Sequence, residues 1–422
     1  MHRFSINKII ANPPVFMKKS IPFSPPRIDE KTIQAVKDVL ESGWITTGPR
    51  TKEFESEIAK YCGVSHAVAV NSWTNGMEVV LRWMGIEAGD EVIIPAYTYC
   101  ASANVIIHCG ATPVMVDINE SDFLISIEKV REAITPKTKA IMGVDIAGLP
   151  CDYDALYALV NETEIRTLFR AKNDFEHKLG RIAILADAAH SFGATYSGRK
   201  SGNLADISVF SFHAVKNLTT SEGGAVCFNL PQPFDHAEIY KEFSIKILHG
   251  QSKDALAKSQ LGSWRYDVVE PGFKCNMTDI QAAIGLIELK RYDSENLVRR
   301  KEIFKFYDSA FSSKKWAHTP VYKDESRETS YHVYLLRLRD CTEVQRDEIM
   351  NKIFDEQISV NVHFQPLPLL TAYKNMGFSM DSYPQSFLNY ACEISLPVYF
   401  DLSSGDLTRI ADAVIHAVES IL

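Results

Sequence analysis

Residues Val209–Gly224 read VFSFHAVKNLTTSEGG and place a single lysine, Lys216, in an apolar and hydroxyl-lined stretch. A lysine attacks carbonyl carbons efficiently only when its amine is kept neutral, by desolvation or by a nearby positive charge. Phe210, Phe212 and Val215 make the surroundings of Lys216 apolar, which disfavours the alternative of a solvated surface lysine. This stretch therefore predicts a nucleophilic lysine soon after a strand.

An aspartate ends an earlier apolar run. Residues 182–186 (IAILA) are followed by Asp187-Ala188-Ala189-His190. An aspartate at the end of a buried strand suits pairing with a protonated pyridine nitrogen, and His190 would then lie near the ring hydroxyl. Taken alone, Asp187 could cap a helix and His190 could be a hydrogen-bonded core histidine. Asp187 and Lys216 together indicate pyridoxal 5′-phosphate as the cofactor.

Two further motifs follow apolar runs. Asn71–Gly76 (NSWTNG) comes after Ala67–Val70 and opens a helix, whose free backbone N–H groups would bind a cofactor phosphate. A plain Ser/Thr helix cap is the simpler alternative. Tyr99 and Asn104 follow Glu91–Ile94, where Tyr99 could stack on a flat ring and Asn104 could reach its substituents. A core tyrosine explains Tyr99 equally well.

The first half of the chain alternates helical patterns with short apolar runs, which predicts a mostly parallel central sheet flanked by helices, an α/β fold. Ligands of such sheets bind beyond the carboxyl ends of the strands. The predicted strands are Ala67–Val70, Glu91–Ile94, Pro113–Val116, Ala140–Val144, Ile182–Ala186, Ile207–Phe210 and Ala225–Phe228.

The pattern changes after the predicted helices Thr278–Lys290 and Ser294–Ser309. A smaller C-terminal α+β domain is predicted there, with strands Tyr331–Leu338 and Val360–His363 and helices Glu343–Glu356 and Leu407–Ile421. The expected organisation is an N-terminal extension (residues 1–20), a large domain (21–290) and a small domain (291–422). The polar segment 161–180 is predicted to be a surface excursion, with a solvated extra turn of helix as the simpler alternative.

Composition excludes several classes of protein. The 422 residues carry a net charge of −8, which argues against a nucleic-acid partner. Eight scattered cysteines support neither a disulfide framework nor a zinc site, so no metal is expected and a reduced, cytoplasmic setting is predicted. The sequence has no run of about 18 apolar residues, so no membrane span is expected. Met1–Ser20 lacks the continuous apolar region of a signal peptide.

With these motifs assembled, the chain resembles the DegT/StrS family of sugar-nucleotide aminotransferases, from about Ile21 to its C-terminus. The family has the fold type I architecture of aspartate aminotransferase. The matching landmarks are Gly43–Pro49 (GWITTGP), Gly89–Pro95 (GDEVIIP), Gly110–Val114 (GATPV), Asp187–His190, Ser211–Gly224 and Asn276–Ile280 (NMTDI).

The resemblance implies a role for each site residue. Lys216 would carry the cofactor and move protons, and Asp187 would bind the pyridine nitrogen. His190 would lie near the phenolic oxygen and Tyr99 on the ring. Thr74, Asn75, Ser211 and, from the neighbouring subunit, Asn276 would bind the phosphate. Asn104 and His213 complete the implied cofactor site, and Thr46 and His363 would contact the substrate.

The implied reaction moves an amino group from L-glutamate to the 4-keto group of a nucleotide-linked 6-deoxyhexose, with UDP as the expected nucleotide, for surface or capsular polysaccharide. The implied assembly is a homodimer with shared active sites. A 3-keto sugar aminotransferase and a non-catalytic cofactor-binding scaffold are the alternatives. Lys216 disfavours the dehydratase branch, in which histidine replaces the lysine.

The sequence departs from the family pattern at three places. Trp73-Thr74-Asn75 replaces smaller residues, Ala186 replaces a frequent acidic residue, and segment 161–180 is longer than usual. The last departure leaves open whether this segment alters the rim of the site.

Overall fold

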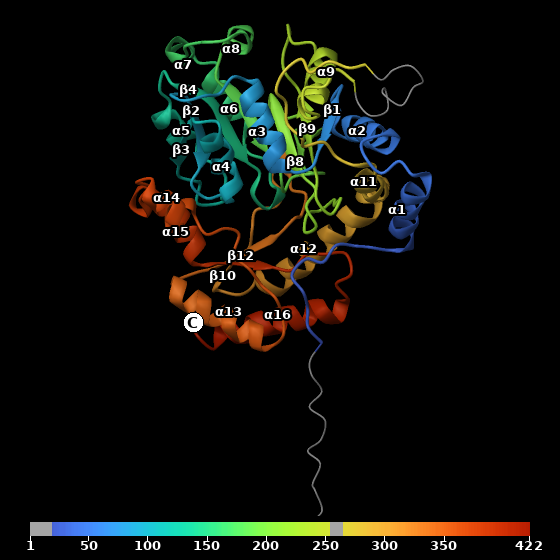
Figure 1. Ribbon diagram of the computed structural model, residues 1–422. Coiled ribbons are helices and arrows are strands. Elements are labelled where there is room, and N and C mark those ends of the chain that lie inside the picture. The colour runs from blue at the N-terminus through green and yellow to red at the C-terminus, as the bar shows by residue number, and fades with distance from the viewer. Residues whose placement is uncertain (1–18, 254–264) are drawn as a thin grey trace, which may run out of the picture.

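The computed structural model describes residues 19–253 and 265–422 (Figure 1). The predicted N-terminal extension, residues 1–20, lies almost entirely outside the described residues. A seven-stranded sheet forms the centre, in the order β1-β9-β8-β5-β4-β2-β3. Its strands are β1 (Ala67–Val70), β2 (Glu91–Pro95), β3 (Thr112–Val116), β4 (Thr138–Val144), β5 (Ala183–Asp187), β8 (Ile207–Ser211) and β9 (Gly224–Phe228).

All seven predicted strands are present. Their ends shift by at most two residues, as at the start of β4, predicted at Ala140 and found at Thr138. Strand β9 runs antiparallel to β1 and β8, while the remaining neighbours pair in parallel, so the sheet is mixed but mostly parallel. Nearly every strand residue is buried, as expected for a sheet that is covered on both faces.

Alternate strand residues enter two separate apolar cores. On one face Ile93 and Ile184 pack with helices α2, α5, α6 and α11. On the other face Ile94 and Leu185 pack with α3, α4 and α9. The helices of this part are α1 (Glu30–Ser42), α2 (Pro49–Cys62), α3 (Trp73–Trp83), α4 (Cys100–His108), α5 (Ile127–Ala133), α6 (Tyr153–Val160), α7 (Thr163–Leu168), α8 (Asp174–Leu179), α9 (His236–Lys246) and α11 (Asp279–Lys290).

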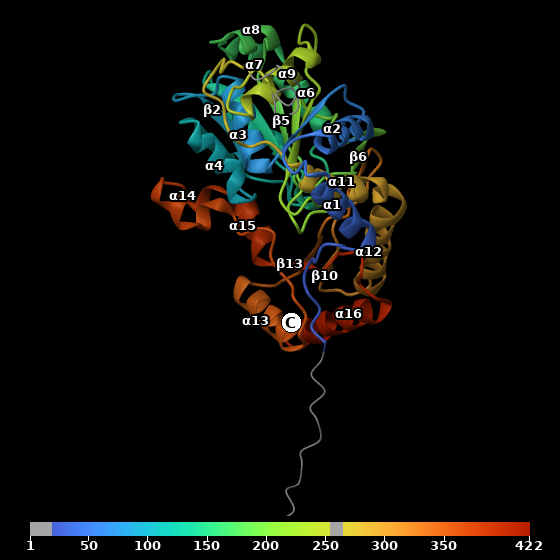
Figure 2. The ribbon, with the colours of Figure 1, turned by 45° about the vertical axis from the view of Figure 1, so that its right-hand side comes forward.

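The C-terminal part has its own antiparallel sheet, in the order β10-β12-β13, and its own core. Figures 1 and 2 place it below the carboxyl ends of the large sheet. Its elements are α12 (Leu297–Phe311), β10 (Ala317–His318), β12 (Tyr334–Leu338), α13 (Glu343–Asp355), α14 (Thr371–Asn375), α15 (Pro384–Ala391), β13 (Glu393–Leu396) and α16 (Ser404–Glu419). Two-residue strands β6 (Thr195–Tyr196), β7 (Arg199–Lys200) and β11 (Arg327–Glu328) form a third small sheet.

The structure corrects two strand predictions in this part. Val360–His363 forms no strand, because only Asn361 makes a bridge, with Ser395. The partner of β12 is instead β13, which was not predicted. Ile21, assigned by prediction to the large domain, packs in the C-terminal core. The domain boundary at residue 290 stays a prediction.

Segment 161–180 forms two short helices, α7 and α8. It is more than a surface excursion, because part of it is buried. Glu176 of α8 is only 3% exposed and lies 2.8 Å from the buried Lys139 Nζ at the amino end of β4. Figure 1 shows α7 and α8 at the end of the sheet opposite the C-terminal part. The segment therefore does not reach the carboxyl ends of the strands.

Candidate functional site

A cavity of about 520 Å³ opens at the carboxyl ends of β1, β2, β4, β5 and β8, where they meet the C-terminal part. Eight of the predicted site residues line it: Thr74, Tyr99, Asp187, His190, Ser211, His213, Lys216 and His363. Asn75, Asn104, Asn276 and Thr46 are not among its lining residues.

Lys216 is half-buried and turns part of its surface to the cavity. Within the described part of the chain its amine forms neither a hydrogen bond nor an ion pair. Burial lowers the pKa of Lys216 to about 8, and the charge of Asp187 only partly opposes this shift. A substantial fraction of the amine is therefore neutral near physiological pH, as nucleophilic attack requires.

Asp187 ends β5 and is 5% exposed. Its carboxyl accepts hydrogen bonds from the Ser102 hydroxyl (2.8 Å) and from the backbone N–H of Ala189 (3.2 Å). Burial raises the pKa of Asp187 to about 6, although both hydrogen bonds and Lys216 favour the carboxylate. A cation placed against Asp187 would relieve this cost of desolvation.

His190 has an unsatisfied polar atom. Its buried Nδ1 has no hydrogen-bond partner among residues 19–253 and 265–422. Burial, followed by the charge of Lys216, holds the pKa of His190 well below its usual value, so the ring is neutral. A core histidine with all bonds satisfied, the alternative considered for the sequence, is therefore excluded.

His332 is a site residue that sequence reasoning missed. Its ring centroid lies 4.3 Å from that of His190, and its Nδ1 lies 2.7 Å from Asn217 Oδ1. Burial holds the pKa of His332 well below the usual value as well. Nothing near His332 in the sequence marks it, since the fold brings it to the cavity from the C-terminal part.

The amino end of α3 forms one side of the cavity. Ser72 caps this helix by accepting from the backbone N–H of Asn75 (3.1 Å), so the predicted cap is present. Asn75 Nδ2 donates to Asn71 (2.8 Å). A Cβ at Gly224 would lie 2.9 Å from the backbone N of Trp73, so only glycine lets β9 approach this turn. Free N–H groups at such a helix end attract a phosphate.

Tyr99 is 59% exposed at the cavity, which excludes the alternative of a core tyrosine. Asn104 accepts a hydrogen bond from the Tyr373 hydroxyl (2.7 Å). Thr46 is exposed, and its backbone carbonyl accepts from the N–H of Asp279 (3.1 Å).

Asn276 is held by its own subunit outside the cavity. It donates to Thr47 Oγ1 (2.5 Å), accepts from Lys274 Nζ (2.5 Å) and forms a backbone bridge with Val70. Thr278 caps α11 in a capping box. The roles predicted for Asn104, Thr46 and Asn276 stay predictions.

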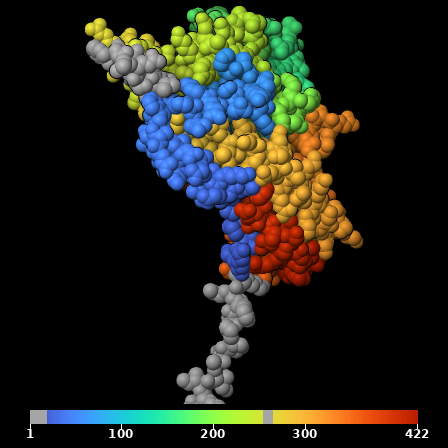
Figure 3. All heavy atoms as spheres, turned by 90° about the vertical axis from the view of Figure 1, so that its right-hand side faces the viewer, coloured from blue at the N-terminus to red at the C-terminus, as the bar shows by residue number. Residues whose placement is uncertain are grey.

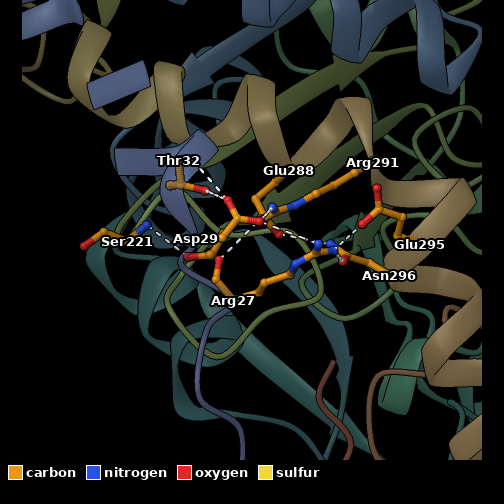
Figure 4. A network of polar contacts seen from close by, with 9 residues as sticks. Arg27, Asp29, Thr32, Ser221, Glu288, Arg291, Glu295 and Asn296 are labelled. Carbon is orange, nitrogen blue, oxygen red and sulfur yellow. Dashed lines mark hydrogen bonds and ion pairs between the residues drawn. The ribbon is translucent and has the colours of Figure 1, made fainter. Parts of the chain in front are cut away.

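The segment before α1 closes one wall of the cavity, a feature that the sequence did not indicate. Phe23 stacks on His363 with ring centroids 5.4 Å apart, and the Ser24 hydroxyl donates to the Val215 carbonyl (3.2 Å). Figure 4 shows how the segment is anchored: Arg27 pairs with Glu295 (2.7 Å), and Asp29 with Arg291 (2.5 Å).

Comparison with known proteins agrees with this site. The model of the DegT/DnrJ/EryC1/StrS aminotransferase family matches residues 26–415. The chain belongs to this family. It is 39% identical over 406 residues to the spore coat polysaccharide biosynthesis protein SpsC of Bacillus subtilis, covering 95% of this chain and 97% of SpsC.

Solved structures of the family confirm the predicted fold class. The putative sugar aminotransferase Spr1654 of Streptococcus pneumoniae, in its PMP form, has a TM-score of 0.92 and 47% identity, covering 95% of this chain and 100% of that one. Helicobacter pylori PseC, an aminotransferase in pseudoaminic acid biosynthesis, has a TM-score of 0.81 and 28% identity, with coverage of 95% and 100%. The family and fold inferred from the sequence are therefore confirmed.

In residues 19–253 and 265–422, no helix has the length and hydropathy to cross a bilayer. The same residues contain no group of three His, Cys, Asp or Glu side chains arranged to hold a metal ion.

Proposed function

We propose that this aminotransferase moves an amino group from L-glutamate to the 4-keto group of a UDP-linked 6-deoxyhexose, for surface polysaccharide biosynthesis. The observation that carries the proposal is the desolvated Lys216 amine in one cavity with the buried Asp187 carboxyl. A related chain is described as a sugar aminotransferase and another as a spore coat polysaccharide protein, which supports a sugar substrate.

The cofactor is pyridoxal 5′-phosphate, since Spr1654, a family member 45% identical to this chain, has been solved in its PLP form. The cavity residues fit it. His190 offers an unpartnered ring nitrogen, Asp187 a buried carboxyl that gains from a cationic partner, and the amino end of α3 a phosphate site. When bound, pyridoxal 5′-phosphate supplies the electron sink and carries the amino group between the two substrates.

The protein's own residues hold the cofactor and move the proton. Asp187 would keep the ring nitrogen protonated, His190 would lie by the ring hydroxyl, and Tyr99 would cover the ring. Lys216 Nζ would take the proton from Cα of L-glutamate. In the second half of the reaction the same amine returns a proton to the sugar carbon. Thr74 and Ser211 bind the phosphate, with Asn75, Asn104 and His213 as the further cofactor contacts.

The proposed assembly is a cytoplasmic homodimer in which Asn276 reaches the partner's cofactor phosphate. Figure 3 faces the side of the molecule where α1 and α2, in blue, lie next to α11. A groove between these three helices is lined by apolar side chains, among them Ala35, Leu286 and Leu289, and by charged ones such as Glu53 and Lys60. Ile33 and Leu40 of α1 do not line the groove and are more than half exposed. Exposed apolar side chains on α1 and the apolar part of this groove favour burial against a second copy.

The experiment that tests the function is a substrate panel. Purified protein is incubated with L-glutamate labelled with ¹⁵N and with UDP-, dTDP- and GDP-linked 4-keto and 3-keto sugars, and products are weighed by mass spectrometry. The proposal expects ¹⁵N in the UDP-linked 4-amino sugar. If the label appears in a 3-amino sugar, amination occurs at C3 and not at the proposed C4. If no sugar of the panel becomes labelled, the proposal is overturned.

A further inference from the structure

A chain of hydrogen bonds runs from the cavity into the C-terminal sheet behind His363. Its Nδ1 lies 2.9 Å from Ser395 Oγ, which lies 2.6 Å from Glu393 Oε1. The other carboxyl oxygen, Glu393 Oε2, accepts a hydrogen bond of 3.1 Å from the backbone N–H of His363. Ser395 and Glu393 belong to β13 and are fully buried. Two side chains, His363 and Ser395, thus connect the cavity with a buried carboxyl.

The second ring nitrogen of His363 is free to meet a ligand. His363 lines the cavity, and its Nε2 has no hydrogen-bond partner among the described residues and is not sealed from solvent. The rest of the residue is fixed, because its carbonyl accepts from the Tyr97 hydroxyl (2.7 Å) and its ring stacks on Phe23. Nε2 is therefore the open end of the chain of bonds.

Glu393 forms no ion pair among the described residues, although the charge of the nearby Arg346 favours its carboxylate form. The nearby Arg346 of α13 directs its guanidinium to Asp347 and to backbone carbonyls. Arg337, which pairs with Glu393 across β12 and β13, directs its guanidinium to Asn389 and to the loop before α5. A buried carboxyl without a cation binds its proton tightly. Burial raises the pKa of Glu393 to about 8.

The imidazole of His363 has the opposite tendency. Burial, and next the charge of Lys216, lower its pKa to about 3. The ring therefore cannot store an added proton, but its two nitrogens can take one and release another at the same time. Ser395 has the same capacity, since a hydroxyl donates and accepts at one atom.

We propose that Glu393, Ser395 and His363 form a proton relay, with Glu393 as the proton store and His363 as the group that meets the substrate. The proposal rests on the amine transfer proposed above. Before the transfer, the Glu393 carboxyl is protonated and donates a hydrogen bond to Ser395 Oγ. The Ser395 hydroxyl donates a hydrogen bond to His363 Nδ1, and His363 Nε2 carries a hydrogen. His363 is then a catalytic residue, and Ser395 and Glu393 are positioning residues that act through it.

The transfer balances in protons and charge. His363 Nε2 gives its proton to the carbonyl oxygen that the keto sugar loses as water. The incoming amino group gives up the second hydrogen of that water and bonds to the carbon as the carbon–oxygen bond breaks, and the positive charge left on nitrogen balances the charge that Glu393 gains. At the same time Nδ1 takes the proton of Ser395 Oγ, and Ser395 takes the proton of Glu393, which becomes a carboxylate. The half-reaction with L-glutamate consumes water and runs the relay in reverse, so that Glu393 recovers its proton.

The proton store can be tested on the protein without substrate. Infrared difference spectra between wild type and Glu393→Gln should show the carbonyl band of a protonated carboxyl below about pH 7, and it should fade with a midpoint near 8. If the difference spectra show only a carboxylate between about pH 6 and about pH 9, Glu393 is no store and the relay is wrong. This result does not depend on the identity of the sugar.

The transfer is tested by single turnovers of each half-reaction, with L-glutamate and with the UDP-linked 4-keto-6-deoxyhexose. Glu393→Gln keeps the shape of the carboxyl but holds no transferable acid proton, and Ser395→Ala interrupts the chain. Both should slow each half-reaction roughly 10²-fold while the cofactor absorbance is retained. Ser395→Thr restores a hydroxyl and should recover most of the rate.

Ser208→Ala is the matched control. Ser208 is a buried strand serine on β8 whose hydroxyl has no partner in the described residues, so its loss should leave the rates unchanged. Rates of Glu393→Gln and Ser395→Ala equal to those of Ser208→Ala would overturn the relay, as would a Ser395→Thr variant no faster than Ser395→Ala. If the wild type transfers no amine to these substrates, the proposed function fails and the infrared result alone decides on the store.

Discussion

At the scale of single residues, burial favours the neutral forms of both Lys216 and Asp187. It lowers the pKa of the lysine to about 8 and raises that of the aspartate to about 6. The sequence predicted both residues, because each follows or ends an apolar strand. It could not predict His332 or Phe23, which reach the cavity from segments distant in the chain. Apolar neighbours in sequence indicate burial, but contacts between distant segments depend on the fold.

Asp187→Asn should keep the cofactor bound and lose most of its turnover. A neutral amide cannot stabilise a protonated ring nitrogen, so the electron sink weakens, and kcat should fall on the order of 10²-fold or more. Stopped-flow measurement of amine transfer from L-glutamate checks this. Turnover close to the wild-type value would show that Asp187 does not have the role assigned to it.

The pKa of Lys216 predicts how apo-protein takes up the cofactor. Only the neutral amine reacts, so the rate should rise with pH and level off above about 8, well below the ordinary lysine value of 10.5. Because the charge of Asp187 raises the pKa of Lys216, Asp187→Asn should shift the midpoint to lower pH. A rate that keeps rising through about pH 10 would contradict the desolvated environment of this amine.

At the scale of elements, buried strands were predictable and short pairings were not. The runs of the large sheet are apolar on both faces, so their residues alone indicate them. In the C-terminal part, β13 (EISL) begins with the buried Glu393. Because two of its four residues are polar, its sequence did not indicate a buried strand. Val360–His363 has strand-like residues, but it borders the cavity and pairs only at Asn361. The polar residues of segment 161–180 indicated an exposed position. The structure buries Glu176 instead, because its charge is matched by Lys139, which lies 37 residues away in the sequence.

Glu176→Gln tests what this segment does. It leaves the Lys139 ammonium buried without its counter-ion, which should lower the free energy of unfolding by roughly 3 kcal/mol. Urea unfolding measures the loss, and the exposed Glu164→Gln on α7 is the matched control with little expected effect. Well below the unfolding transition, kcat should stay at the wild-type value, because α8 lies at the amino end of β4. A loss of kcat there would mean that the segment acts on the site after all.

At the scale of the whole molecule, the open question is how two subunits complete a site. One chain brings Lys216, Asp187 and the amino end of α3 to a single cavity, whereas Asn276 lies outside it. The sequence could propose a shared site only through the family resemblance, since one chain's residues do not show which surface a partner covers. The groove between α1, α2 and α11 is the surface that this account assigns to the partner.

Mixing two inactive variants tests that assignment. Lys216→Ala chains lack the cofactor lysine, and Asn276→Ala chains, once shown to be impaired, lack the predicted phosphate contact. If each site borrows Asn276 from its partner, one site of a mixed dimer has both residues, and some activity should return on subunit exchange. With exchange demonstrated, an absence of rescue would mean that Asn276 serves its own subunit.

The central claim, that Lys216 carries the cofactor in this cavity, can be tested by chemical trapping. Holoenzyme is reduced with borohydride, digested, and the peptide that keeps the cofactor is identified by mass spectrometry. The visible cofactor absorbance should disappear, and one peptide, with the modification on Lys216, should carry the label. A label on Lys274 or Lys290 instead, or no covalent label at all, would contradict it.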